Sequence, residues 1–179
     1  MEEKALITGL QQGEPSAVDA LVLAYGNRLL RAAFSLCGNP TDAQDIVQDT
    51  LVQAIQSIQR FRGDAALYTW LHGILLNMAR RHRRRQGKLI PVENLPEEPN
   101  ETQERPGPAG ALVADEDAAA LFAALQTISE EHREILVLRY FENQTIAQIS
   151  DALGIPGGTV KSRLHYAVDA LRKKMDKKL

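Results

Sequence analysis

A glycine-rich turn between two helical patterns constrains this chain more than any other feature, and it lies in residues 144–174. Thr145 and Gln148 have the spacing of a capping box, which predicts that a helix begins there. Gly154 stands where a left-handed residue would end that helix, and the Pro-Gly-Gly sequence at 156–158 makes the turn. Two helices joined in this way are typical of a helix-turn-helix.

The second helix of this motif is expected to be capped by Thr159 and to be amphipathic. Its apolar stripe consists of Val160, Leu164, Ala167, Val168, Leu171 and Met175. The opposite face carries hydrogen-bond donors: Lys161, Ser162, Arg163, His165, Tyr166 and Arg172. Donors on one helix face suit phosphates and base edges in a major groove, so the pattern predicts DNA as a partner.

The composition is that of an ordinary globular protein, with 179 residues, 44% of them hydrophobic and 25% charged. No run approaches the ~18 apolar residues of a membrane helix, and the acidic start lacks the apolar core of a signal peptide. We therefore expect a cytoplasmic protein without membrane insertion. Cys37 is the only cysteine, so no internal disulfide can form, and its helical apolar context predicts a buried thiol.

A proline-rich acidic segment at residues 88–116 divides the chain. It holds five of the eight prolines and seven acids, with few large apolar residues, which predicts a flexible linker. Residues 1–87 and 117–179 show helical periods and no strand pattern. The expected fold is all-α, with two small helical domains joined by that linker.

Three helices are predicted in residues 2–12, 16–36 and 41–58, with the last opening on a Thr41/Gln44 capping box. That third helix is predicted to bury Ile46, Val47 and Ile55 among others. Its opposite face is polar: Asp42, Asp45, Gln48, Asp49, Gln53 and Gln56. Acids near a helix N-terminus are favoured by the dipole, so the pattern leaves two readings open, a solvated face or a contact for a basic protein.

Residues 61–71 interrupt the helical pattern with Gly63 and Asp64 and bring three aromatic residues together. The following helix has Trp70 on its apolar stripe, where a core role is expected. It ends in a basic run: Arg80, Arg81, His82, Arg83, Arg84 and Arg85. The helix dipole favours cations there, but five arginines in six residues exceed that need, and they suit a nucleic-acid backbone beside unstacked bases.

Catalysis is not expected, and neither is a cofactor. The four histidines are scattered, and the sequence has no metal-ligand spacing, nucleophile elbow or phosphate-binding glycine loop. Two functions stay open for such a chain at this point. One is a helix-turn-helix regulator that acts alone, and the other is a metal-dependent nuclease using Asp45 and Asp49.

Three segments in order resemble one family: residues 25–54, 61–77 and 129–174. They are similar to regions 2 and 4 of the extracytoplasmic-function (ECF) RNA polymerase sigma factors of the sigma-70 family. The resemblance implies domains at 1–87 (region 2) and 117–179 (region 4), with the 88–116 linker threading the polymerase. It also implies binding to bacterial core RNA polymerase, through the clamp of its largest subunit, and to promoter DNA, with control by an anti-sigma factor.

The resemblance also implies roles for individual residues. Core polymerase would be bound by Asp42, Asp45, Gln48 and Asp49. A flipped base of the −10 element would be captured by Gly63, Asp64, Ala65, Ala66, Leu67, Tyr68 and Asn77. The −35 element would be read by Lys161, Ser162, Arg163, His165 and Tyr166, and DNA phosphates would be held by Arg139, Thr159, Arg80, Arg83 and Arg84. Arg81 stands where the family often has an aspartate.

Overall fold

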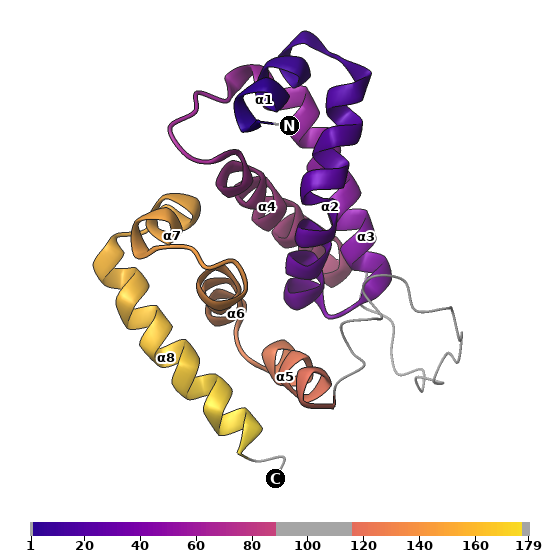
Figure 1. The fold of residues 1–179 in the computed structure, drawn as a ribbon. Helices are drawn as coiled ribbons and strands as arrows, with labels where there is room; N and C mark the ends of the chain where they lie inside the picture. Colours follow the sequence, from indigo (N-terminus) through magenta and orange to yellow (C-terminus); the bar gives the residue numbers. More distant parts are fainter. Residues whose placement is uncertain (1, 89–115, 177–179) are drawn as a thin grey trace.

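The structure is a computed structural model that describes residues 2–88 and 116–176 (Figure 1). Its elements are α1 (Glu3–Gln12), α2 (Pro15–Cys37), α3 (Pro40–Ser57), the 3-10 helix η1 (Ile58–Arg60), α4 (Leu67–Lys88), α5 (Glu116–Thr127), α6 (Glu130–Leu136), the π-helical turn η3 (Val137–Phe141), α7 (Ile146–Leu153) and α8 (Gly157–Met175). No strand occurs within these two ranges, and the all-α prediction is confirmed. The predicted linker falls almost wholly outside the described residues.

Helices α1 to α4 form an N-terminal unit in which α2, α3 and α4 pack side by side (Figure 1). These helices meet along apolar stripes because leucine and isoleucine recur at helical spacing on the inner side of each. Burying such side chains stabilises the fold by about 1.5–3 kcal/mol each. The largest fully buried side chains of this unit are Leu21, Leu29, Leu36, Ile46, Leu67, Leu71, Leu75 and Leu76.

Helices α5 to α8 form a C-terminal unit in which α8 packs against α5, α6 and α7. A π-helical turn continues α6, and Glu142 N–H donates to the carbonyl of Val137 at 3.0 Å. Asn143 then takes a left-handed conformation with φ 52°, which turns the chain back toward α7. The two units share one apolar cluster, in which the rings of Phe34 and Phe122 lie 5.2 Å apart.

Helix caps confirm part of what the sequence predicted. Thr145 and Gln148 form the predicted capping box, and Gly154 ends α7 with φ 65°. Gly13 and Gly38 end α1 and α2 in the same left-handed conformation. Ser129 accepts a hydrogen bond from the backbone N–H of His132 and caps α6. Each of these caps depends on residues that are neighbours in the sequence.

Two predicted caps were wrong. The cap of α3 is Asn39 rather than Thr41. The side chain of Asn39 accepts from the N–H groups of Thr41 and Asp42, and Pro40 takes the first helical position. Helix α8 begins at Gly157 after the extended residue Pro156, without a side-chain cap. Thr159 therefore lies inside the first turn of α8 rather than at its cap.

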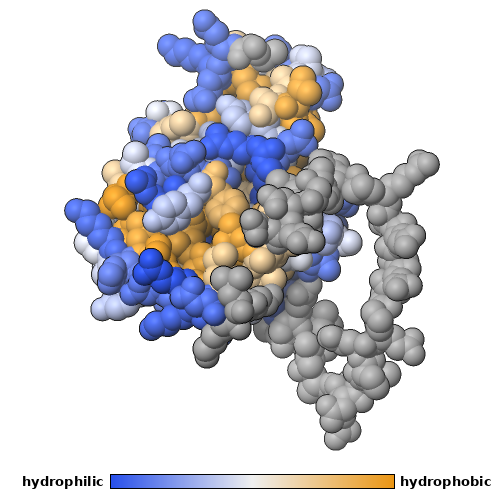
Figure 2. Space-filling view, turned by 60° about the horizontal axis from the view of Figure 1, so that its bottom comes forward, coloured by the Kyte–Doolittle hydropathy of each residue, from blue (hydrophilic) through white to orange (hydrophobic). Residues whose placement is uncertain are grey.

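Several large apolar side chains are exposed, among them Ile55, which was predicted to be buried. Figure 2 shows a face where hydrophobic residues gather between hydrophilic ones. Val22 and Ile55 are 46% and 37% exposed, and Tyr140 is 61% exposed. The stripe of α8 is only partly covered, since Val168 and Met175 stay exposed. Cys37 is half-buried rather than buried. No helix in residues 2–88 or 116–176 combines the length and apolar character needed to cross a bilayer.

The cap of α3 gives a direct test of this fold. Replacing Asn39 by Ala removes the acceptor for two backbone N–H groups, so we expect the free energy of unfolding to fall by about 1 kcal/mol. Thr41→Ala, at the position that the sequence pattern favoured, should change it by less than about 0.5 kcal/mol. Urea denaturation followed by circular dichroism measures both; a larger loss for Thr41→Ala would contradict this cap.

Candidate nucleic-acid interface

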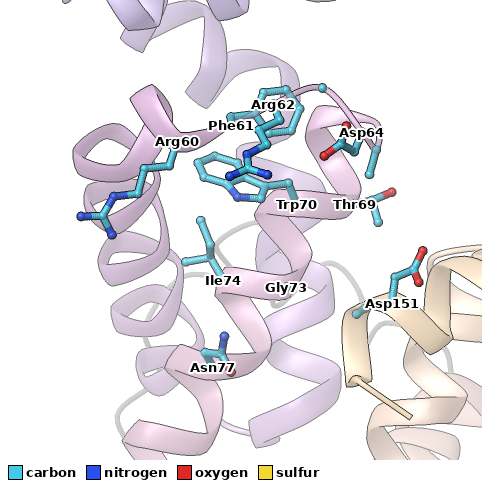
Figure 3. A pocket seen from close by; sticks show the side chains of 13 residues that line it. Arg60, Phe61, Arg62, Asp64, Thr69, Trp70, Gly73, Ile74, Asn77 and Asp151 are labelled. Atoms are coloured by element: carbon cyan, nitrogen blue, oxygen red, sulfur yellow. The ribbon is translucent and has the colours of Figure 1, made fainter. Parts of the chain in front are cut away.

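A pocket opens beside the N-terminal half of α4, where the loop at residues 61–66 folds back over the helix (Figure 3). The loop can reverse because Gly63 adopts φ 78°. The first turn of α4 is fixed by α1, since the N–H of Leu67 donates to Glu3 Oε1 at 3.2 Å. The loop therefore connects two anchored elements, η1 and α4.

Aromatic rings line this pocket, which has a volume of about 400 Å³. The rings of Phe61 and Trp70 lie 5.2 Å apart at an interplanar angle of 50°. Asn77 lies two turns further along α4, and its polar side chain is exposed at the end of the pocket (Figure 3). Flat apolar rings with a nearby carboxamide form a site of the kind that stacks and hydrogen-bonds a planar base.

Only some of the residues predicted for base capture are accessible at the pocket. Gly63, Asp64, Ala65 and Asn77 line the pocket, and Ala66 is exposed beside it; other lining residues are Arg60, Arg62, Thr69, Gly73 and Ile74. Leu67 is fully buried. Sequence reasoning missed Arg60 and Arg62, although two arginines flanking a phenylalanine are a recognisable signal for a nucleic-acid backbone.

Tyr68 points away from the pocket into the space between the two units. It is 7% exposed, stacks with Tyr25 at 5.7 Å between ring centroids, and lies under the guanidinium of Arg28 at 3.6 Å. Burial, with Glu142 nearby, raises the pKa of its hydroxyl far above the ordinary value. In this arrangement Leu67 and Tyr68 support the loop from below and are not accessible to a base.

The arginines at the end of α4 do not all face solvent. Arg80 donates to both carboxylate oxygens of Glu134 at 2.8 and 2.6 Å, and Arg83 pairs with Glu130. The two hydrogen bonds to Glu134 raise the pKa of Arg80. Arg84 remains exposed, and its side chain donates to the Arg80 carbonyl. Sequence reasoning could not find these acids, because the partners of each pair lie about 50 residues apart.

Helix α8 presents most of its predicted DNA-reading residues to solvent. Lys161, Ser162, His165 and Tyr166 are exposed, and the rings of His165 and Tyr166 contact each other at 5.6 Å. Arg163 Nη2 lies 3.4 Å from Glu131 Oε2. Two predicted phosphate contacts flank this face: Thr159 is half-buried in the first turn, and Arg139 is exposed and donates to the Gln144 carbonyl.

A second concave surface lies between α2 and α3, with a volume of about 460 Å³. It is mainly apolar, and Leu23 at its edge is 87% exposed. We name it the α2–α3 groove, and its lining residues are Val22, Leu23, Gly26, Asn27, Leu30, Gln44, Val47, Gln48 and Leu51. Sequence reasoning missed Leu23, although a leucine outside the apolar phase of its helix is a signal for an exposed contact.

The acidic residues predicted to bind a partner lie near this groove, with one exception. Asp45 and Asp49 are exposed on α3, and Gln48 lines the groove itself. Asp42 faces α4 instead, where its Oδ1 lies 3.2 Å from His82 Nε2. Among the residues that the structure describes, no group of three or more His, Cys, Asp or Glu side chains could hold a metal ion.

Polar groups are buried where the two units meet. Arg28 Nε donates to Glu142 Oε2 at 3.0 Å, and its Nη2 donates to the Glu142 carbonyl at 3.3 Å. Burial raises the pKa of Glu142. His72 is fully buried, and neither of its ring nitrogens has a hydrogen-bond partner among the described residues. Burial, aided by the charge of Arg28, lowers the pKa of His72 to about 4.

Comparison with known families gives two matches that together span most of the described chain. Residues 21–89 match sigma-70 region 2, and residues 124–173 match sigma-70 region 4. The chain is 31% identical to the RNA polymerase sigma-H factor of Pseudomonas aeruginosa, over 96% of this chain and 93% of that protein. It is 28% identical to the ECF RNA polymerase sigma-E factor of Haemophilus influenzae, over 98% and 96% of the two chains.

Two solved structures share the fold. CnrH in complex with the cytosolic domain of CnrY superposes with a TM-score of 0.71 at 25% identity, covering 98% of this chain and 97% of that one. The sigma factor RpoE in complex with the anti-sigma factor NepR from Bartonella quintana gives a TM-score of 0.69 at 24% identity, covering 88% and 96%. Both helical units are therefore of a known architecture.

The buried His72 predicts how stability depends on pH. Its pKa falls from 6.5 in the unfolded chain to about 4 in the folded one, so the unfolded chain binds more protons between these values. The free energy of unfolding should drop as the pH falls from 6.5 toward 4, by up to about 3 kcal/mol, with no further loss from this group below pH 4. Urea titrations across this range measure the loss.

The matched variants for this test are His72→Phe and His165→Phe. His72→Phe keeps an aromatic ring against Tyr68 and removes the titrating group, so it should flatten the pH dependence. His165→Phe changes an exposed histidine and should leave the dependence as in the parent protein. An unchanged slope in His72→Phe would show that other groups cause it.

Proposed function

The chain belongs to the ECF sigma factors of the sigma-70 family and directs transcription initiation, and we propose that it does so by opening and reading promoter DNA on two surfaces. The N-terminal unit takes a base from the non-template strand of the −10 element. The C-terminal unit reads the −35 element as duplex. Family membership favours this function over the nuclease and over the regulator that acts without polymerase.

The observation that carries this proposal is the pocket beside α4. A single strand needs a stacking surface for bases and cations for its phosphates. Phe61 and Trp70 supply the rings, Asn77 supplies a donor and an acceptor for a base edge, and Arg60 and Arg62 lie at the same pocket. Unstacking a base costs a few kcal/mol, and capture in such a pocket offsets part of that cost.

The exposed face of α8 supports duplex reading at −35. A recognition helix enters the major groove with its N-terminal residues toward the bases. Lys161, Ser162 and His165 are exposed in the first half of α8, and Tyr166 adds an exposed ring. Arg139 and Thr159 lie beside this face and would contact the phosphate backbone.

The α2–α3 groove supports binding to core polymerase. An apolar groove with an exposed leucine at its edge fits the apolar face of a partner helix, and acids beside it favour a basic one. Asp45 and Asp49 provide that acidic edge on α3, and Gln48 adds a polar side chain to the groove itself. We assign this surface to the clamp of the largest polymerase subunit. Asp42 would contribute from the first turn of α3 after exchanging its contact with His82.

The regulatory partner proposed for this chain is an anti-sigma factor. CnrH is bound to the cytosolic domain of CnrY, and RpoE of Bartonella quintana is bound to the anti-sigma factor NepR. The chain shares the two helical units of those proteins over most of its length. In this proposal it works in the bacterial cytoplasm as a non-catalytic subunit of the polymerase, and needs no cofactor of its own.

Run-off transcription with purified core polymerase tests the function. DNA from upstream of the chain's own gene should give a promoter-dependent transcript only when the protein is added. Asn77→Ala should reduce that transcript about tenfold or more, because a lost base contact costs about 1–3 kcal/mol. Permanganate reactivity of unpaired thymines should fall with it, whereas binding of a −35 duplex should stay unchanged.

Two outcomes would contradict these assignments. Specific operator binding by the free protein, without any transcript on addition of core polymerase, would favour the regulator that acts alone. Equal loss of DNA opening and of −35 binding in Asn77→Ala would remove the base-capture role from this residue. Thr8→Ala on α1, an exposed side chain outside the pocket, is the matched control and should behave as the parent protein.

The assignment of the α2–α3 groove predicts the effect of reversing a charge at its edge. Asp45→Arg should weaken binding to core polymerase about tenfold, because a basic clamp would then meet a like charge. Co-sedimentation on a glycerol gradient with core enzyme measures this. Asp176→Arg makes the same change at an exposed residue after α8 and should leave binding unchanged. Normal binding by Asp45→Arg would mean that the polar face of α3 is solvated and does not contact core polymerase.

A further inference from the structure

We propose that helix α1 is a positioning element for base capture, which holds the loop at residues 61–66 by both of its ends. This inference rests on the proposed function, since it concerns the same pocket. It gives a role to a part of the chain that lies before residues 21–89, which match sigma-70 region 2. Helix α1 lies at the end of the N-terminal unit where α4 begins (Figure 1).

The loop itself has little packing that could fix its position. Residues 62–66 are exposed, so burial does not hold them. Gly63, with φ 78°, lets the chain reverse but carries no side chain that could anchor it. The loop joins η1 to α4, and its position depends on where these two elements lie. Any contact that fixes η1 and the start of α4 relative to each other therefore also fixes the shape of the pocket.

Glu3 of α1 holds the end of the loop where α4 begins. Its Oε1 accepts a hydrogen bond from the N–H of Leu67 at 3.2 Å, and its Oε2 accepts one from the hydroxyl of Tyr25 at 3.3 Å. The first N–H groups of a helix have no acceptor within the helix, and the helix dipole favours a carboxylate there. Tyr25 lies on α2 and stacks with Tyr68 of α4 at 5.7 Å between ring centroids. One carboxylate thus ties the first turn of α4 to both α1 and α2.

The other end of α1 holds η1, from which the loop starts. The side chain of Gln11 donates to the carbonyl of Ile58 at 3.5 Å, and the side chain of Gln59 donates to the carbonyl of Gln11. Glu3 and Gln11 are eight residues apart on one helix, so they lie about 12 Å apart along its axis. Helix α1 therefore sets the separation between the two ends of the loop.

Close packing on α2 fixes α1 in turn. Leu6 and Leu10 are buried in the apolar core. A Cβ atom added at Gly9 would lie 2.9 Å from the Cβ of Ala17 and 3.0 Å from Oε2 of Glu14, and the first distance is shorter than side chains tolerate. The backbone of α1 needs glycine to come this close to α2. Because this contact does not involve the loop, it offers an independent way to displace α1.

A loop that is held at both ends offers a preformed site to a base. Without that support, part of the binding energy would be lost in ordering the loop when a base binds. Arg60 and Arg62 lie at the same pocket, beside Phe61, and their placement depends on the same loop. Loss of the Glu3 contacts should therefore weaken capture of the −10 strand, whereas the −35 surface on α8 should keep its affinity.

Glu3→Ala and Glu3→Gln are the sharpest test, since both remove one negative charge but only glutamine keeps an acceptor for Leu67 and a partner for Tyr25. Simple electrostatics predicts equal or stronger DNA binding by both variants. The positioning role predicts that Glu3→Ala loses about fivefold in run-off transcript with core polymerase and in permanganate reactivity, whereas Glu3→Gln stays close to the parent protein. Co-sedimentation with core polymerase and binding of a −35 duplex should stay unchanged in both.

Trp70 reports the state of the loop in the free chain, since it is the only tryptophan and its ring contacts that of Phe61. Quenching of its fluorescence by acrylamide should increase in Glu3→Ala and stay as in the parent protein in Glu3→Gln. Gly9→Ala should displace α1 and give the same losses and the same increase in quenching without any change of charge. Glu2→Ala removes an exposed neighbouring charge that makes no side-chain cap, and is the matched control.

A transcript from Glu3→Ala equal to that from the parent protein would overturn the proposal. So would an equal loss in Glu3→Ala and Glu3→Gln, because the charge rather than the hydrogen bonds would then matter. Loss of core binding in step with the transcript would also overturn it, since the whole unit and not the loop would be affected. Failure of the sigma function is a separate result, in which the parent protein itself gives no transcript while Trp70 quenching still distinguishes Glu3→Ala from Glu3→Gln.

Discussion

The apolar packing of α4 is the interaction on which the rest of the structure depends. Leu71, Leu75 and Leu76 are almost fully buried, and α4 packs against both α2 and α3. This packing holds the helix in place, so Trp70, which packs partly against the core, and the exposed Asn77 keep fixed positions beside the pocket. A site for an unstacked base requires such support, because the binding energy would otherwise be lost in ordering the loop.

The outer side of α4 cannot be stabilised in the same way, since side chains that bind DNA must be polar and reachable. Arg80 and Arg83 carry charges that need partners when they are partly removed from water. In the free chain those partners are Glu134 and Glu130 of α6, and on a promoter they would be phosphates. The same physical need thus links the folding of the chain with its proposed binding to DNA.

The α2–α3 groove is a second surface of the N-terminal unit that needs a partner, and it shares no residue with the pocket. Val22 and Leu23 are exposed although each is strongly apolar, and the cost of hydrating them is recovered only when a partner covers them. Polymerase would cover the apolar side chains of the groove, and promoter DNA would pair with the charged side chains of α4. The two surfaces share no residue: α2 and α3 line the groove, whereas the 61–66 loop and α4 contribute most of the pocket.

The sequence alone determined what depends on neighbours along the chain: the all-α class, the Thr145–Gln148 capping box, the left-handed end at Gly154, and the exposed face of α8. Helical period and cap chemistry are local, so a sequence displays them. Tertiary structure decided the burial of Tyr68 beneath Arg28, the groove beside Leu23, and the pairing of Arg80 with Glu134. Those contacts join residues that are not neighbours in the chain. Packing of helices within the N-terminal unit creates the first two, and packing of one unit against the other creates the third.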